Sequence, residues 1–359
     1  MQTSTERGAP AELTDTPALP SISVIIPVFD AQDWIEPTVR HVEAAVRRSA
    51  FSDVEIVLVD DGSGDRSGEV MDALTSELPL RIVHQENSGR FIARLRGLEA
   101  AHGSSAFLID IRVFVDDTAL AFLAEQLRAH PDRQVWNGHT RTATSWKPWT
   151  RFWNPLTFMA WRTYLAKPTT TSFGIDDYDD YPKGTGFFFA PRQHLIDLCA
   201  AFDTSYDDVS KASDDTLLIK PLAETMRINI SPDFGGLYFP RDKFGDFIRH
   251  SYFRGTTFVD GHLRPGNRFN TLFWRLVPIG IVGAAALLRW PKRVGTSAAV
   301  GLATLPLAGR AVGIPLADGM SFAVLAPLFT VVYSTGIARG LWMRFRARAT
   351  PPGTARSQH

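Results

Sequence analysis

The first third of the chain alternates between short apolar runs and longer amphipathic stretches. The apolar runs are rich in β-branched and large side chains, as in strands buried on both faces, and they cover residues 21–30, 55–61, 80–84 and 105–110. The stretches between them repeat apolar residues at helical spacing, and they cover residues 33–49, 67–78 and 90–102. This alternation predicts an α/β domain with a parallel sheet and right-handed crossovers.

Carboxylates stand at the ends of two predicted strands. The second run ends in Asp60 and Asp61, followed by Gly-Ser-Gly, and the fourth run ends in Asp110. Ligands of open α/β sheets bind at the carboxyl ends of the strands, so these side chains predict a site for a polar ligand at that edge. The alternative is that Asp60 and Asp61 only form an Asx turn.

The second half is less regular, and three of its features bear on function. Five of the nine tryptophans fall within residues 136–161, where they predict a surface that stacks on sugars or rests at a membrane interface, or else a local core under a long loop. A Gly-Thr-Gly turn at residues 184–186 leads into an aromatic strand. Asp214 and Asp215 stand at the start of a predicted helix, where free amides and the helix dipole stabilise negative charge. Helix capping alone is the alternative explanation for this acidic pair.

Long apolar segments begin after Thr271, at residues 276–288, 294–317 and 320–337. A single membrane span needs about 20 residues, so we expect an interfacial or re-entrant first helix followed by a hairpin of two spanning helices that turns near Asp318. A soluble helical core is the alternative. Two basic clusters flank these segments and should face the cytoplasm, which places the protein at the membrane with its α/β domain on the cytoplasmic side. The clusters are Arg289, Lys292 and Arg293, and Arg339, Arg344, Arg346 and Arg348.

Composition excludes several other classes of protein. The formal net charge is zero, which gives no reason to expect a nucleic-acid partner. Cys199 is the only cysteine, so there is no internal disulfide. The first residues lack the apolar core of a signal peptide. We therefore expect a disordered tail at residues 1–20 and an α/β domain in two halves, at residues 21–118 and 119–270. Membrane-associated helices should follow at residues 271–345, and a basic disordered tail at residues 346–359.

Three motifs in the α/β domain resemble those of the inverting family 2 glycosyltransferases. They are Val24-Ile-Ile-Pro27-Val-Phe29-Asp30, Val59-Asp60-Asp61-Gly62-Ser63, and Asn87-Ser-Gly89 followed by Ala93-Arg94. The resemblance covers about residues 21–258 and is strongest up to about residue 115. It implies a GT-A fold, an α/β/α sandwich with a mostly parallel sheet that binds a nucleotide-sugar. The membrane-bound tail is similar to that of members with lipid-linked acceptors.

The resemblance assigns nucleotide-sugar-binding roles within the first half. Pro27 and Phe29 would lie beside the nucleotide base, and Asp60 and Asp61 would hold the base and ribose. Arg94 would lie near the nucleotide.

On the acceptor side, the resemblance makes Asp215 the catalytic base, with Asp214 in the place of the family's glutamate. The turn of Gly184, Thr185 and Gly186 matches the acceptor-side strand. Arg249 and Arg254 are the nearby cations that would matter most for a phosphate-bearing lipid acceptor. The Gln-x-x-Arg-Trp pattern of processive relatives is not intact around Arg254, which argues against a polymer synthase.

The family's Asp-x-Asp metal motif reads Asp110-Ile111-Arg112 in this chain. We expect a divalent cation, Mn²⁺ or Mg²⁺, held by Asp110 and the donor diphosphate, with His250 or His262 as candidate further ligands. Arg112 has three alternative roles: to replace part of the metal's work, to repel the metal and leave the site inactive, or to turn away and pair with Asp116 or Asp117.

These observations predict a membrane-associated inverting glycosyltransferase that moves a sugar from a nucleotide-sugar to a lipid-linked or cell-envelope glycan acceptor. The alternative is a catalytically impaired GT-A domain that acts as a nucleotide-sugar-binding or scaffold protein. A nucleotidyltransferase is unsupported, because no glycine-rich phosphate loop with a lysine follows the first strand.

Overall fold

The computed structural model describes residues 18–265 and 267–349, and its α/β domain is built on one nine-stranded sheet. The strands run in the order β3-β2-β1-β4-β8-β6-β9-β5, with β7 paired to β9. Their bounds are β1 (Ile22–Val28), β2 (Val54–Asp61), β3 (Leu80–Gln85), β4 (Ser105–Ile109), β5 (Val113–Val115), β6 (Trp136–Thr142), β7 (Thr171–Phe173), β8 (Phe187–Pro191) and β9 (Ile228–Tyr238). The first four strands are parallel, as the sequence predicts, and β8, β5 and β7 add antiparallel pairs.

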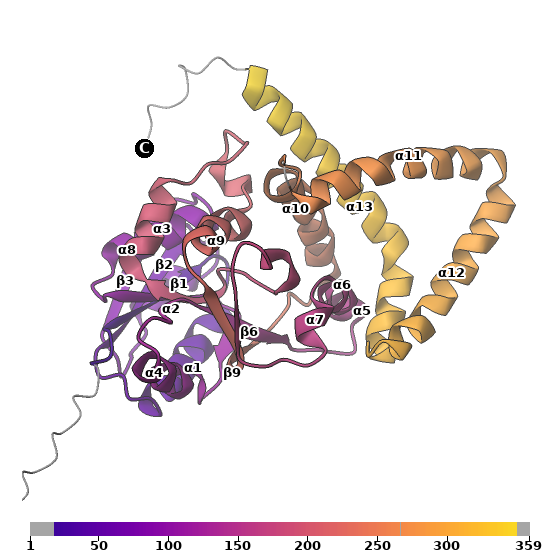
Figure 1. The fold of residues 1–359 in the computed structure, drawn as a ribbon. Coiled ribbons are helices and arrows are strands. Elements are labelled where there is room, and N and C mark those ends of the chain that lie inside the picture. The colour runs from indigo at the N-terminus through magenta and orange to yellow at the C-terminus, as the bar shows by residue number, and fades with distance from the viewer. Residues whose placement is uncertain (1–17, 266, 350–359) are drawn as a thin grey trace, which may run out of the picture.

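Helices cover both faces of the sheet, which gives the predicted α/β/α sandwich (Figure 1). One face packs on α1 (Ile35–Arg47) and α4 (Ala119–Ala129), and the other packs on α3 (Arg90–Ala100), α8 (Arg192–Ala200) and α9 (Asp214–Thr225). Successive strand residues point to opposite faces, so Val24 and Ile26 enter the first core and Ile25 enters the second. The shorter helices are α2 (Ser67–Asp72), α5 (Pro148–Arg151), α6 (Trp153–Ala160) and α7 (Arg162–Leu165).

Helix α2 ends well before residue 78, where the sequence predicts its end. The chain beyond it bonds instead to the buried carboxylate of Glu43 on α1. That carboxylate accepts hydrogen bonds from the Ser76 hydroxyl and the Glu77 amide, both at 2.8 Å. A long-range contact therefore replaces the helical hydrogen bonds that the local pattern favours.

The tryptophan-rich stretch contributes to two cores. Trp136 is fully buried on β6, in the core of the sheet. Trp149 and Trp153 pack with Phe152 in a separate cluster that joins α5 and α6 to the helices after the sheet. Trp146 is 81% exposed. For three of the five tryptophans the structure therefore favours the local-core interpretation.

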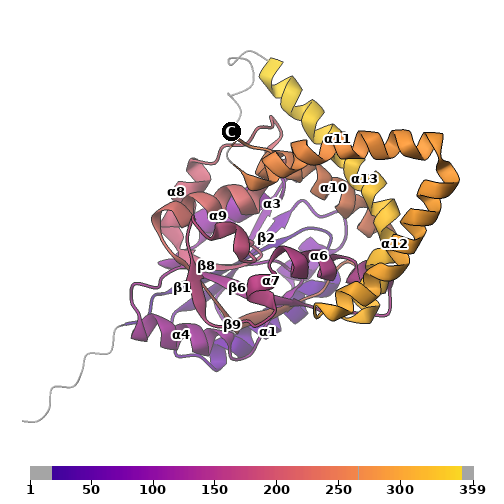
Figure 2. The same cartoon turned by 45° about the vertical axis from the view of Figure 1, so that its right-hand side comes forward.

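The chain after β9 forms four long helices, α10 (Phe244–His262), α11 (Arg268–Arg289), α12 (Pro291–Ala311) and α13 (Leu316–Ala349). Helices α11 and α12 extend away from the α/β domain, and α13 returns along α10 (Figures 1 and 2). Helix α13 includes the first four residues of the expected basic tail. Two helices in the described ranges, α11 and α13, are long and apolar enough to cross a membrane. The second and third segments do form a helix hairpin, in which α12 turns into α13 and contacts it. The candidate spans differ from the expected ones: α11 takes the place of α12, because α11 begins at Arg268, before its apolar run, and is therefore longer than predicted.

Two contacts fix α13 to the α/β domain. At its start, the Asp318 carboxylate accepts hydrogen bonds from Arg151 at 2.8 Å and Asn154 at 3.0 Å. Further along, α13 crosses α10 where Gly255 faces Gly336, and a Cβ atom on either glycine would lie 2.2 Å from a backbone carbonyl oxygen of the opposite helix. This spacing requires glycine at both positions.

Candidate active site

A cavity of about 680 Å³ opens at the carboxyl ends of β1, β2 and β4. Side chains from widely separated parts of the chain line it, including most of those singled out in the sequence. The predicted residues among them are Pro27, Phe29, Asp61, Asp110, Arg112, Asp215, Arg249, His250 and Arg254. The structure therefore brings the acids at 61, 110 and 215 to a single cavity.

The two adjacent aspartates at the end of β2 have different surroundings. Asp61 faces the cavity and accepts hydrogen bonds from the amides of Ser88 and Gly89, at 2.8 and 3.0 Å. Asp60 does not line the cavity, and its carboxylate contacts the Ser63 amide and His84. Neighbouring strand residues point to opposite faces, so only one member of this pair can face the ligand.

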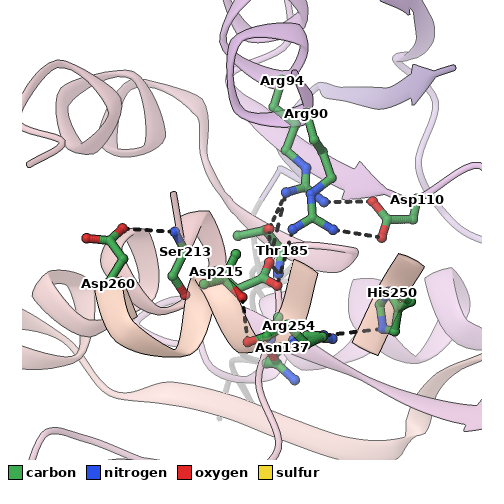
Figure 3. A network of polar contacts seen from close by, with 12 residues as sticks. Arg90, Arg94, Asp110, Asn137, Thr185, Ser213, Asp215, His250, Arg254 and Asp260 are labelled. Carbon is green, nitrogen blue, oxygen red and sulfur yellow. Dashed lines mark hydrogen bonds and ion pairs between the residues drawn. The ribbon is translucent and has the colours of Figure 1, made fainter. Parts of the chain in front are cut away.

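Two arginines of α3 join the two remaining acids (Figure 3). Arg94 is 1% exposed and donates to the Asp110 carboxylate at 2.7 Å and to the Thr185 hydroxyl at 2.5 Å. One turn earlier, Arg90 lies 3.9 Å from Asp110 and 3.6 Å from Asp215. Asp215 also accepts hydrogen bonds from the Thr185 amide at 2.9 Å and from the Thr185 hydroxyl.

These contacts set the charge of Asp215. Burial opposes ionisation, but the nearby charges of Arg90 and Arg94 and the hydrogen bonds from Thr185 outweigh it. Together they lower the pKa of Asp215 well below the usual range of an aspartate, so its carboxylate is ionised at neutral pH.

The turn at residues 184–186 supports the acids from beneath the cavity and does not line it. The Gly184 amide donates to Asn137 at 3.1 Å. A Cβ atom on Gly186 would lie 2.6 Å from an Asp110 oxygen, so a larger residue would displace that carboxylate. The side chain of Asp214 lies outside the described part of the structure.

The basic residues of α10 stand at the cavity wall. Arg249 is exposed and pairs with Asp246 at 2.7 Å, whereas Arg254 donates to the His250 ring at 3.4 Å. Burial, together with Arg254 and two further arginines, lowers the pKa of His250 to about 3, so its ring is neutral. His262, the other candidate ligand, stacks on Phe258 and does not line the cavity.

Sequence reasoning missed several cations of the cavity: Arg90, Lys211, Arg241 and Arg339. Arg90 carried a usable signal, because it precedes Arg94 by four residues and so shares its helix face. No sequence pattern places Arg241 and Arg339 at this cavity, because only the packing of β9, α10 and α13 brings them there.

The chemistry of the cavity does not fit the expected Mn²⁺ or Mg²⁺. At nucleotide sites such ions are held by one or two carboxylates together with phosphate oxygens of the substrate. The described residues contain no group of three or more His, Cys, Asp or Glu side chains placed to hold a metal, so a metal here would depend on Asp110 and the diphosphate. Asp110 is engaged by Arg94, and the second acidic position of the motif is Arg112.

Arg112 itself lies over the Trp34 ring, 4.5 Å from the ring centroid. Asp116 pairs with Arg141 and Asp117 pairs with Arg48. The alternative that Arg112 pairs with one of these two acids is therefore wrong.

Comparison with known proteins relates part of the α/β domain to one family. Residues 23–195 match the family model "Glycosyl transferase family 2". The chain is 33% identical to the uncharacterised glycosyltransferase EpsJ of Bacillus subtilis over 109 residues, which cover 30% of each protein. It is 30% identical to an undecaprenyl-phosphate 4-deoxy-4-formamido-L-arabinose transferase of Pseudomonas paraeruginosa over 131 residues, 36% of this chain and 38% of that protein.

The chain thus spans about a third of the length of these curated relatives. Among solved structures, it resembles the mannosyltransferase PcManGT of Pyrobaculum calidifontis in complex with GDP-Man and Mn²⁺, with a TM-score of 0.50, 18% identity and coverage of 91% of this chain and 89% of that one. This likeness supports the GT-A fold predicted from the sequence. Residues 23–195, just under half of the chain, are therefore similar to family 2 glycosyltransferase domains.

Proposed function

We propose that this protein is an inverting glycosyltransferase that moves a sugar from a nucleotide-sugar to an acceptor at a membrane surface. One observation carries the proposal: Asp61, Asp110 and Asp215, far apart in the sequence, face one cavity at the ligand-binding edge of a family 2 sheet. A volume of about 680 Å³ is in the range of small-molecule and cofactor sites.

The donor side is formed by the ends of β1 and β2 and the loop before α3. Phe29 is 41% exposed and offers a ring face to a nucleotide base, with Pro27 beside it. Asp61 orders the loop through the Ser88 and Gly89 amides. This hydrogen-bonded loop gives the base and ribose a preformed surface, which lowers the ordering cost of binding.

On the acceptor side, Asp215 acts as general base. An acceptor hydroxyl attacks the anomeric carbon from the face opposite the nucleotide, its proton passes to the Asp215 carboxylate, and the nucleotide diphosphate leaves with the bonding electrons. Thr185, Arg90 and Arg94 hold the carboxylate in place and keep it ionised. General-base catalysis of this kind contributes about 10²–10⁴-fold to the rate.

The acceptor that best fits the molecule is lipid-linked. Helices α11 and α13 are long and apolar enough to insert into a membrane, and α13 packs on α10, whose Arg249 and Arg254 line the cavity. Relatives named undecaprenyl-phosphate 4-deoxy-4-formamido-L-arabinose transferase support a lipid acceptor. A lipid-linked glycan supplies the hydroxyl that Asp215 deprotonates, whereas the oxygen of a polyprenyl phosphate is already anionic, so that there Asp215 would matter less and Arg249 and Arg254 more. The α/β domain would then lie on the cytoplasmic side, with the basic end of α13, which carries Arg339, Arg344 and Arg346, at the membrane surface.

Substitution of Asp215 tests the proposal. Asp215→Asn keeps the shape of the side chain but removes its charge, so sugar transfer should fall by about 10²-fold or more while nucleotide binding persists. Asp233→Asn on β9, exposed and away from the cavity, is the matched control. Near-normal turnover by Asp215→Asn would refute the assignment.

The cation at position 112 favours one second candidate, a nucleotide-sugar-binding scaffold without catalysis. The two functions separate in one assay, in which wild-type protein is supplied with a panel of nucleotide-sugars and donor consumption is followed. A scaffold would bind a donor, seen as a thermal shift, and leave it intact.

A further inference from the structure

The charges around the cavity are unbalanced. Besides Arg112, its cationic residues are Arg90, Lys211, Arg241, Arg249, Arg254 and Arg339, against the acids Asp61, Asp110, Asp215 and Asp246. Three of the cations have acidic neighbours: Arg90 lies near Asp215, Arg249 pairs with Asp246, and Lys211 lies 3.6 Å from Asp208. The cavity therefore has more positive charge than its own acids neutralise.

Four arginines account for the excess, and one of them, Arg112, lies over the Trp34 ring. In the described part of the chain, Arg241, Arg254 and Arg339 form no ion pair with a carboxylate within 4.0 Å. Arg254 donates only to the neutral His250 ring, and Arg339 lies 5.5 Å from the ring centroid of Tyr252, which also lines the cavity. The low pKa of His250, to which burial, Arg254, Arg90 and Arg241 all contribute, is a second sign of positive potential at this wall.

The three arginines come from three elements with fixed relative positions. Arg241 follows β9, Arg254 is on α10, and Arg339 is on α13. The crossing of Gly255 and Gly336 lies one residue from Arg254 and three residues from Arg339, so the backbone contact holds both guanidinium groups on the same wall. A helix long enough to cross a membrane thus supplies a cation to the nucleotide-sugar cavity.

We propose that Arg241, Arg254 and Arg339 bind the diphosphate of the nucleotide-sugar in this cavity, without a divalent cation. Guanidinium groups carry permanent charge and contact phosphate oxygens in bidentate fashion, so they stabilise the negative charge that develops on the leaving diphosphate. Their presence accounts for the replacement of the second metal-motif acid by Arg112, because a site with this charge does not need a metal to neutralise the diphosphate. The inference rests on the proposed function and adds to it the means of diphosphate binding.

The test is calorimetric titration of the full-length protein in detergent with UDP, GDP, dTDP and ADP, each in EDTA and in Mn²⁺. We expect at least one diphosphate to bind in EDTA with a dissociation constant within about twofold of that in Mn²⁺. Loss of one charge-assisted contact should weaken that binding by about tenfold or more in Arg254→Gln and in Arg339→Gln, and Arg254→Lys should restore part of it. Affinity for the parent nucleoside should change little, which separates a diphosphate contact from a general loss of structure.

Arg293→Gln, an exposed position on α12, is the matched control for loss of one positive charge and should bind as wild type. Binding that requires Mn²⁺ would overturn the inference and leave the proposed function standing. Metal-free binding that neither Arg254→Gln nor Arg339→Gln weakens would overturn the assignment of the arginines. Absence of binding under both conditions would overturn the inference together with the proposed function.

Discussion

The crossing of α10 and α13 allows a quantitative test of how the C-terminal helix is attached. A Cβ atom on Gly336 would lie 2.2 Å from the Tyr252 carbonyl oxygen and 3.0 Å from the Gly255 Cα. Carbon and oxygen atoms in close helix contacts stay about 3.3–3.6 Å apart, so Gly336→Ala requires the helices to separate by about 1 Å. The obstructing atoms are backbone, which a side-chain rotation cannot relieve.

Overpacking of this kind costs about 1–3 kcal/mol, and the higher helix propensity of alanine returns about 1 kcal/mol. The net loss should therefore be at most about 2 kcal/mol relative to wild type, and about 1–3 kcal/mol relative to an alanine substitution that meets no clash. It is measured as a lower midpoint of thermal unfolding in detergent at a fixed scan rate. Gly283→Ala on α11 is the control, because a Cβ atom there meets nothing within 4 Å, and it should unfold at or slightly above the wild-type temperature. The reasoning is refuted if Gly336→Ala is as stable as Gly283→Ala.

Three further predictions concern the site and its support. Asp61→Ala removes the acceptor for the Ser88 and Gly89 amides and should weaken nucleotide binding by about tenfold, which titration with the preferred nucleotide would measure; unchanged affinity would contradict the docking scheme. The lowered pKa of Asp215 stabilises the fold above the ordinary aspartate value of 3.8 and is lost as pH falls below it, so acid titration should destabilise wild type more than Asp215→Asn; parallel curves would refute the depressed pKa. Asp318→Ala leaves two donors without their buried acceptor and should lower the free energy of unfolding by about 1–3 kcal/mol in a denaturant titration, whereas a change below about 0.5 kcal/mol would mean that this contact does not hold α13 in place.

The position of α13 also bears on how activity would respond to the membrane. The helix is tied at its start through Asp318, crosses α10 in backbone contact, and ends beyond Arg339, which lines the cavity. Displacement of α13 would therefore move a cavity residue. We expect the preferred diphosphate to bind less tightly to Gly336→Ala than to Gly283→Ala, although neither substitution lies in the cavity.

The sequence by itself determined the first half of the fold and the outline of the site. Apolar runs buried on both faces specify parallel strands, and the chain order of strands and helices then leaves few topologies. The same reasoning places Asp61 and Asp110 at one edge, because carboxyl ends of parallel strands meet there. These are local or nearest-neighbour properties, which a single sequence contains.

Tertiary structure decided what depends on contacts between distant segments. It directs Asp61 into the cavity and Asp60 away from it, pairs Asp110 with Arg94, and brings Arg339 across from the C-terminal helix. The partner of such a side chain depends on how segments distant in the sequence pack together, and the hydrophobic periodicity of the chain does not predict it. The charge of a carboxylate or an imidazole depends on those partners, so the charge states in the cavity could be inferred only from the tertiary structure.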